Sequence, residues 1–85
     1  MKTIGLLGGM SWESTESYYR ALNTGIKASL GGLHSARVVM VSVDFADIEA
    51  LQRQEGWEAM ANILAREARD IQMAGADMLL IATHT

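Results

Sequence analysis

The sequence has 85 residues, a formal net charge of −3 and 49% hydrophobic residues. Its seven lysines and arginines form no cluster, so it offers no basic surface for phosphates, which excludes nucleic acid as a partner. It contains no cysteine and therefore has no disulfide, no cysteine metal ligand and no thiol nucleophile.

Membrane insertion and secretion are not expected. The longest uninterrupted apolar run, residues 78–82, is far shorter than the roughly 20 residues of a membrane-spanning helix. The apolar stretch after Lys2 is broken by Gly8-Gly9 and lacks a small-residue cleavage site, so we expect no signal peptide and a cytoplasmic protein. The hydrophobic content is nevertheless high for so short a chain, which indicates apolar surface that another domain or subunit covers.

Three apolar runs predict strands. The second of them is rich in Val and shows almost no polar alternation, as expected of a parallel strand covered on both faces. We expect the last of them to be buried. The predicted strands are residues 2–7, 37–43 and 78–82.

Two long amphipathic segments predict helices between these strands. Ser11 is placed to cap the first helix, which has an apolar face and ends at Gly31-Gly32. A short, polar, helix-prone segment follows the second strand and reaches Gln54. The second long helix starts at about Gly56 and ends at Gly75, with apolar residues three and four positions apart.

This alternation predicts an α/β fold with a three-stranded parallel sheet in the order 2-1-3 and helices on both faces. The connections then leave the first strand in opposite directions, and a binding crevice is expected at the carboxyl ends of the strands there. Polar clusters at residues 8–11, 42–44 and 83–85 fall at these ends. Since the chain stops at the third cluster, we expect residues 1–85 to be one domain of a longer protein or the product of a truncated gene.

The glycines after the first strand allow two interpretations. Gly8-Gly9 let the backbone approach a ligand, and the N–H groups at the following helix start attract an anion. The spacing is neither that of a dinucleotide-binding fingerprint nor that of a P-loop. A small-anion site and a simple tight turn both remain open.

Five stretches together resemble the aspartate/glutamate racemase family. They run from one end of the sequence to the other, but they correspond only to the first of the family's two similar α/β domains. The stretches are KTIGLLGGMSWEST at residues 2–15, Tyr18-Tyr19, residues 33–36, residues 42–45 and residues 74–77.

The resemblance implies an amino-acid racemase that uses neither pyridoxal phosphate nor a metal. In this family the active site lies between the two domains, where two acid/base residues face the substrate α-carbon from opposite sides. One removes the α-proton and the other returns a proton on the far face. The implied partners are therefore a dicarboxylic amino acid, aspartate or glutamate, and the missing C-terminal half of the protein.

The family's first acid/base residue is usually the cysteine of a Cys-Asn-Thr motif at a strand end. Here the corresponding residues are Thr83-His84-Thr85, and Thr83 takes the catalytic position, as in one branch of the family. A threonine hydroxyl delivers a proton more easily than it abstracts one, so unequal handling of the two enantiomers is expected. His84 replaces the usual Asn, and proton transfer, ligand contact alone and a degraded strand end all remain open for it.

By the same resemblance, Met10 and Ser11 line the pocket, Gln52 approaches the substrate, and Thr85 holds its α-carboxylate. The alternatives are an ordinary buried methionine, an exposed helix residue at Gln52 and a helix cap at Thr85. We expect Asp44 to cap a turn or helix and not to catalyse.

The alternative function is a non-catalytic module that pairs with itself or with another chain through its apolar surface. The absence of cysteine and the presence of His84 favour this alternative. The hydrolytic or lyase chemistry of the related maleate isomerases and hydantoin racemases is a third possibility. It is less favoured, because residues 8–12 resemble the aspartate/glutamate racemases.

The excess of apolar residues favours a homodimer. The sequence does not decide whether the substrate is aspartate or glutamate. Trp12 and Trp57 are expected to be core or interface anchors.

Overall fold

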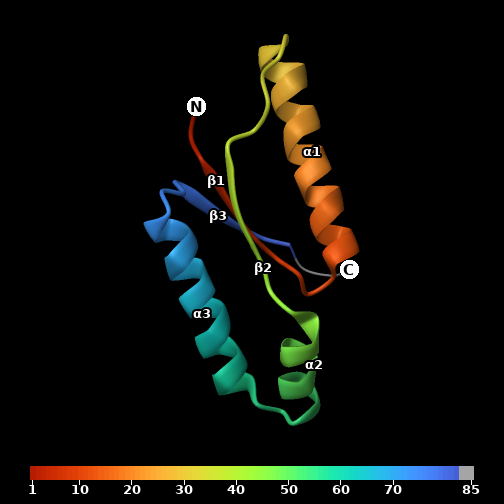
Figure 1. Cartoon of the computed structure of the whole chain (residues 1–85), viewed down its shortest axis with the longest axis vertical. Helices are drawn as coiled ribbons and strands as arrows, with labels where there is room; N and C mark the ends of the chain where they lie inside the picture. The colour runs from red at the N-terminus through yellow and green to blue at the C-terminus, as the bar shows by residue number, and fades with distance from the viewer. Residues whose placement is uncertain (83–85) are drawn as a thin grey trace.

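Strands and helices alternate along the chain in the predicted order. The computed structural model describes residues 1–82 (Figure 1). The elements in this part of the chain are β1 (Ile4–Gly8), α1 (Trp12–Leu30), β2 (Val38–Ser42), α2 (Phe45–Arg53), α3 (Trp57–Met73) and β3 (Met78–Ile81). The three strands form a parallel sheet in the order β2-β1-β3, which confirms the predicted topology.

The register of the sheet brings the carboxyl ends of its strands to one edge. Ile4 in the central strand β1 pairs with Val38 of β2 and with Met78 of β3. Four residues further along, Gly8 pairs with Ser42. Residues that follow the three strands therefore begin at the same edge of the sheet.

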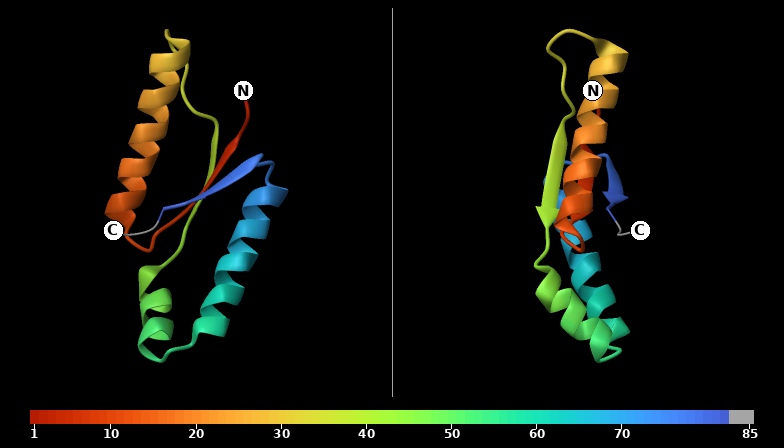
Figure 2. Two further views of the ribbon diagram at one scale, coloured as in Figure 1. Left: turned by 180° about the vertical axis from the view of Figure 1, so that it is seen from behind. Right: turned by 90° about the vertical axis from the view of Figure 1, so that its right-hand side faces the viewer.

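Helices α1 and α3 cover opposite faces of the sheet, while α2 lies beyond its end and beside α3 (Figures 1 and 2). Helix α3 packs on all three strands, whereas α1 approaches mainly β1. Two glycines of β1 make this close packing possible. Gly5 lies against Ile71 of α3, and Gly8 lies against Thr15 of α1, as the alternation of side chains along a strand requires.

Short polar residues cap the starts of α1 and α2, as predicted. Ser11 is the N-cap of α1, and its hydroxyl oxygen accepts a hydrogen bond from the Ser14 N–H at 3.5 Å. Asp44 is the N-cap of α2, and its carboxylate accepts from the Ala46 N–H at 3.0 Å. The prediction that Asp44 is a cap is therefore confirmed.

The core of the described residues is small. Leu6, Leu7, Ile48 and Ile71 are its largest fully buried side chains. The prediction that the last strand is buried is wrong, because the four residues of β3 are between 37% and 51% exposed. β3 lies at the edge of the sheet, and the two long helices are centred on β1, so they leave its apolar side chains open.

The two tryptophans and the second strand are also more exposed than predicted. Trp12 is 65% exposed and Trp57 is 54% exposed, so neither is a core residue within residues 1–82, and a role as interface anchor stays a prediction. Met40 of β2 is 46% exposed, which shows that this strand is not covered on both faces. None of the helices in the described part of the chain is long and apolar enough to span a membrane.

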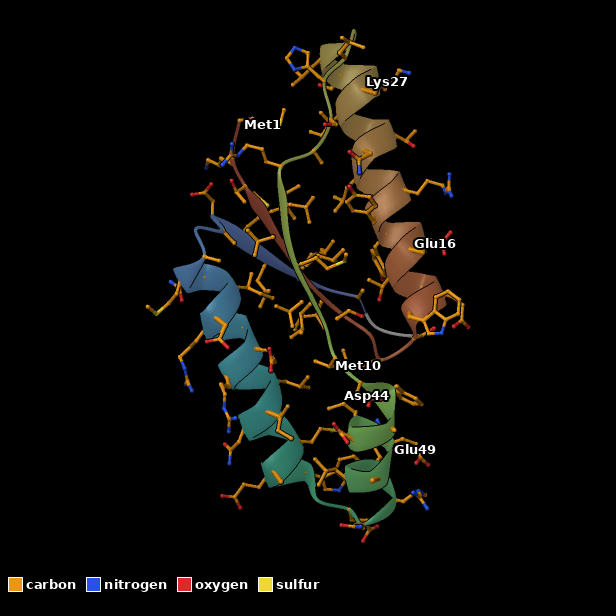
Figure 3. The ribbon with its side chains drawn as sticks, viewed as in Figure 1. Met1, Met10, Glu16, Lys27, Asp44 and Glu49 are labelled. Atoms are coloured by element: carbon orange, nitrogen blue, oxygen red, sulfur yellow. The ribbon has the colours of Figure 1, made fainter. Side chains whose placement is uncertain are left out.

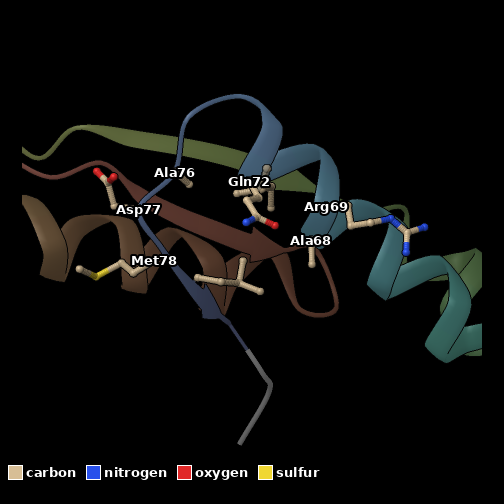
Figure 4. A pocket seen from close by; sticks show the side chains of 8 residues that line it. Ala68, Arg69, Gln72, Ala76, Asp77 and Met78 are labelled. Carbon is tan, nitrogen blue, oxygen red and sulfur yellow. The ribbon is translucent and has the colours of Figure 1, made fainter.

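A hollow of about 290 Å³ lies beside the exposed strand, between α3 and the amino end of β3. Figure 4 shows Arg69 and Asp77 at opposite ends of this hollow. Ile71, Gln72 and Met78 are among the other residues that line it. Its position beside the amino end of β3 separates it from the carboxyl edge, where the polar clusters were predicted to meet.

The overall dimensions agree with incomplete coverage of the sheet. The chain exposes 5826 Å², whereas a compact protein of its mass exposes about 4,900 Å². Its radius of gyration is 14.1 Å, against about 12 Å for a compact domain of 85 residues. The excess surface includes the apolar side chains of β3.

Residues 1–85 produced on their own are therefore expected to self-associate. Apolar patches of this kind are normally covered, and exposed apolar surface binds the dye anilinonaphthalene sulfonate. Light scattering after size-exclusion chromatography should give a mass above that of the monomer, and dye fluorescence should rise. A monomer that leaves the fluorescence unchanged would contradict this expectation.

Candidate functional site

Two of the three predicted polar clusters meet at the carboxyl edge of the sheet. The Val43 N–H, just after β2, donates to the Gly8 carbonyl at 2.8 Å. On the other side of β1, the N–H of the fully buried Ala82 donates to the Leu7 carbonyl at 2.9 Å. The turn after β1 is thus bordered by the end of β2 on one side and by the residue after β3 on the other.

The third cluster, Thr83-His84-Thr85, lies outside the described residues. The roles expected for Thr83, His84 and Thr85 therefore stay predictions. In the described part of the chain, no group of three or more His, Cys, Asp or Glu side chains is placed to hold a metal ion.

Gly9 gives the turn after β1 its shape. Its φ angle is 98°, in the region that favours glycine. A side chain at this position would also meet the backbone of Val43, so the turn passes directly over the end of β2. Both constraints require glycine here.

Thr15 of α1 holds the same turn from the helix side. Its side-chain oxygen accepts a hydrogen bond from the Gly9 N–H at 3.0 Å and lies 3.2 Å from the Ser11 carbonyl, to which its hydroxyl donates. The Gly9 N–H is therefore engaged within the protein and is not a donor for an anion. This observation favours the tight-turn interpretation for Gly9. At the start of α1 the Ser14 N–H is bonded to the Ser11 side chain, which leaves the N–H groups of Trp12 and Glu13 as the donors at this edge.

The structure brings Met10 and Ser11 together in an open hollow of about 360 Å³. Both residues are half-buried, and the lining is completed by Trp12 and Glu13 of α1 and by Phe45 of α2. Figure 3 shows Met10 and Asp44 near one another, where the sheet ends and α2 begins. The substrate-pocket role expected for Met10 and Ser11 stays a prediction.

Gln52 does not line this hollow. It lies near the end of α2 and is exposed, in agreement with the alternative of an exposed helix residue. Its contact with a substrate stays a prediction.

The charge around the hollow is acidic. Glu13 lines it, and Asp44 begins the adjacent helix α2. None of the lysines and arginines in the described part of the chain contributes to the lining. A carboxylate bound here would find the helix N–H groups and the Ser11 hydroxyl as donors, but its countercharge would have to come from outside residues 1–82.

Thr15 was not singled out from the sequence. The available signal was its position four residues after the N-cap Ser11, one helical turn along the same face of α1. A threonine in the first turn of a helix is common on protein surfaces, and its contact with Gly9 became visible only in three dimensions.

Comparison with known proteins decides the family. Residues 7–85 match the model of the family described as Asp/Glu/Hydantoin racemase. The chain belongs to this family. The resemblance identified from the sequence is therefore confirmed over almost the whole chain.

Two solved structures share the fold of this family member. One is a candidate Asp/Glu racemase from Yersinia pestis, with 49% sequence identity and a TM-score of 0.96 over 99% of the present chain. The other is an aspartate racemase homologue from Pyrococcus horikoshii OT3, with 32% identity and a TM-score of 0.77 over 99% of the chain. The present chain spans only 36% of the length of each.

Proposed function

We propose that this chain is the N-terminal part of a cofactor-independent racemase of aspartate or glutamate, and that it forms one wall of the active site. The observation that carries the proposal is the position of Met10 and Ser11. They share a hollow at the carboxyl edge of the sheet, and the chain returns to this edge after β3 through Ala82. Membership of the racemase family supports the same assignment.

In the proposed reaction, Thr83 is one of two acid/base residues and faces one side of the substrate α-carbon. The second acid/base residue comes from the part of the protein beyond these 85 residues and faces the other side. One group takes the α-proton and its counterpart donates a proton to the opposite face, so that the configuration inverts. No proton is gained or lost overall.

The residues around the hollow supply binding in this proposal. The Ser11 oxygen accepts from the Ser14 N–H, which leaves its hydroxyl hydrogen free to donate to a substrate carboxylate. Met10 provides an apolar contact, and Gln52, His84 and Thr85 are the further proposed contacts. The acidic Glu13 implies that the remaining charge neutralisation of a dicarboxylate comes from the rest of the protein.

Because the second acid/base residue and the remaining charge neutralisation come from the rest of the protein, residues 1–85 alone are expected to be inactive. The proposal also includes a homodimer and a cytoplasmic location, as expected from the composition. A non-catalytic module remains the second candidate, and the exposed apolar strand β3 is the observation that favours it.

The test uses the full-length protein, in which the present chain continues into its C-terminal part. It is incubated in deuterated water with L- and D-aspartate, with L- and D-glutamate and, separately, with a 5-substituted hydantoin. Proton NMR follows the loss of the α-proton signal, and chiral chromatography follows the appearance of the other enantiomer.

Racemisation of aspartate or glutamate would establish the proposed function and identify the substrate. Turnover of the hydantoin alone would replace the proposed substrate class, which the family description leaves open. A folded protein that exchanges no α-proton on any of these compounds would support the non-catalytic module.

A further inference from the structure

One side chain ties together the two sides of the turn that carries Met10. Thr15 is 5% exposed, and its hydroxyl group bonds to Gly9 on one side of Met10 and to Ser11 on the other. The first bond uses an oxygen lone pair and the second uses the hydroxyl hydrogen. The two hydrogen bonds require different parts of the same group and form together.

The backbone of this turn has few other internal anchors. Gly8 before it is held by the Val43 N–H, and Ser11 after it accepts from the Thr15 N–H at 3.0 Å as the first hydrogen bond of α1. Between these points, the hydrogen bond from Gly9 to Thr15 is buried. If the hydroxyl were absent, the Gly9 N–H would lack a partner in a buried place, which is unfavourable unless the turn moves toward water.

We propose that Thr15 is a positioning residue of the active site, which sets the placement of Met10 and Ser11 toward the substrate without touching it. This inference rests on the proposed racemase function. The chemical reason is that a displacement of the turn by a fraction of an ångström moves both lining residues together, and substrate binding is sensitive to such displacements.

A second buried threonine provides a matched control. Thr3 directly precedes β1, at the end of this strand opposite to the carboxyl edge, and is 9% exposed. Its hydroxyl oxygen accepts from Arg37 Nε at 3.0 Å, and its N–H donates to the Asp77 carboxylate at 2.7 Å. Thr3 therefore stabilises the fold through comparable hydrogen bonds but is remote from the carboxyl edge.

The experiment compares three variants of the full-length protein with the wild type. Thr15→Val keeps the volume and removes both hydrogen bonds, Thr15→Ser keeps the hydroxyl and removes the methyl group, and Thr3→Val removes the control hydroxyl. For each variant, kcat and KM for the racemised amino acid are measured together with the melting temperature.

A loss of uniform substrate binding raises KM and leaves kcat nearly unchanged. We therefore expect Thr15→Val to raise KM about tenfold, with kcat changed by less than about threefold. Thr15→Ser should stay within about threefold of the wild-type KM, because the two hydrogen bonds persist. Thr3→Val should lower the melting temperature without changing KM.

An unchanged KM in Thr15→Val would overturn the inference, as would an equal rise in Thr3→Val, since both would make Thr15 a purely structural residue. If Thr15→Ser raised KM as much as Thr15→Val, the methyl group and not the hydroxyl would be responsible, and the inference would also be overturned. Hydrogen exchange of the Gly9 amide gives a readout that is independent of activity. Slow exchange in the wild type and in Thr15→Ser, with fast exchange in Thr15→Val, would show that the Thr15 hydroxyl holds the turn. This readout applies even if the wild-type protein fails to racemise its substrates. Such a failure would reject the proposed function but not the hydrogen bonds of Thr15.

Discussion

Replacement of Thr83 by alanine in the full-length protein is expected to abolish racemisation in both directions while sparing α-proton exchange of one enantiomer. An alanine side chain can neither accept nor deliver a proton, and general acid–base catalysis typically contributes about 10²- to 10⁴-fold to a rate. The two enantiomers have equal free energies, so racemisation must fall equally in both directions. Exchange differs, because it requires only the base on the face that carries the α-proton.

The measurement is the α-proton signal in deuterated water, recorded separately for each enantiomer and combined with chiral chromatography. The enantiomer whose α-proton faces the second acid/base residue should still exchange without inverting in Thr83→Ala. Its mirror image should lose exchange. Retention of exchange by both enantiomers, together with racemisation, would remove Thr83 from the proposed mechanism.

Thr83→Cys is the informative companion variant. It restores the residue that the family usually has at this position, and a thiol has a pKa of about 8.5, far closer to neutrality than that of a hydroxyl. We expect racemisation to be retained or accelerated, with exchange of the two enantiomers becoming more similar. Thr83→Ser should retain the wild-type asymmetry, because the hydroxyl remains.

The topology of this protein could be predicted because its determinants are local. The apolar runs of the strands, the cap at Ser11 and the glycines at the ends of α1 and α3 each act within a few residues. The alternation of strands and helices then restricts the connections to right-handed crossovers. The positions of Met10 and Ser11 at the carboxyl edge followed from the same rules.

The exposure of β3 could not be predicted, because the composition of a strand reflects its burial in the complete protein and not in one part of it. Leu79, Leu80 and Ile81 have the composition of a buried strand, yet all are exposed within residues 1–82. The chain spans 36% of the length of the two solved relatives. The composition of the strand alone therefore does not tell how much of it residues 1–82 cover.

The hydrogen bonds between the Thr15 hydroxyl and the turn could not be predicted, for a different reason. It depends on the distance between a side chain on α1 and a backbone N–H six residues earlier, on the other side of a turn whose path was unknown. The sequence indicated that Gly8-Gly9 would allow a close approach, but it did not indicate to what. The structure identifies the approaching groups as Thr15 and the backbone of Val43.

Substitution of Gly9 by alanine is expected to be among the most destabilising single changes in this part of the protein. The φ angle of 98° is unfavourable for alanine, and the new methyl group would meet the backbone N and O atoms of Val43. Val43 cannot easily yield, because its N–H is bonded to the Gly8 carbonyl. Backbone strain and overpacking each cost about 1–3 kcal/mol, so we expect the free energy of unfolding to fall by about 4 kcal/mol.

Gly75 provides the matched control for this prediction. Its φ angle is 106°, close to that of Gly9, but nothing lies within 4 Å of a side chain added there. Gly75→Ala should therefore show the strain alone, about 1–2 kcal/mol. Urea denaturation of the two full-length variants, followed by fluorescence, measures both values. Equal destabilisation would mean that the backbone angle alone requires glycine at position 9, whereas a clearly larger loss in Gly9→Ala would show that the turn is held against the end of β2, which keeps Met10 and Ser11 at the carboxyl edge.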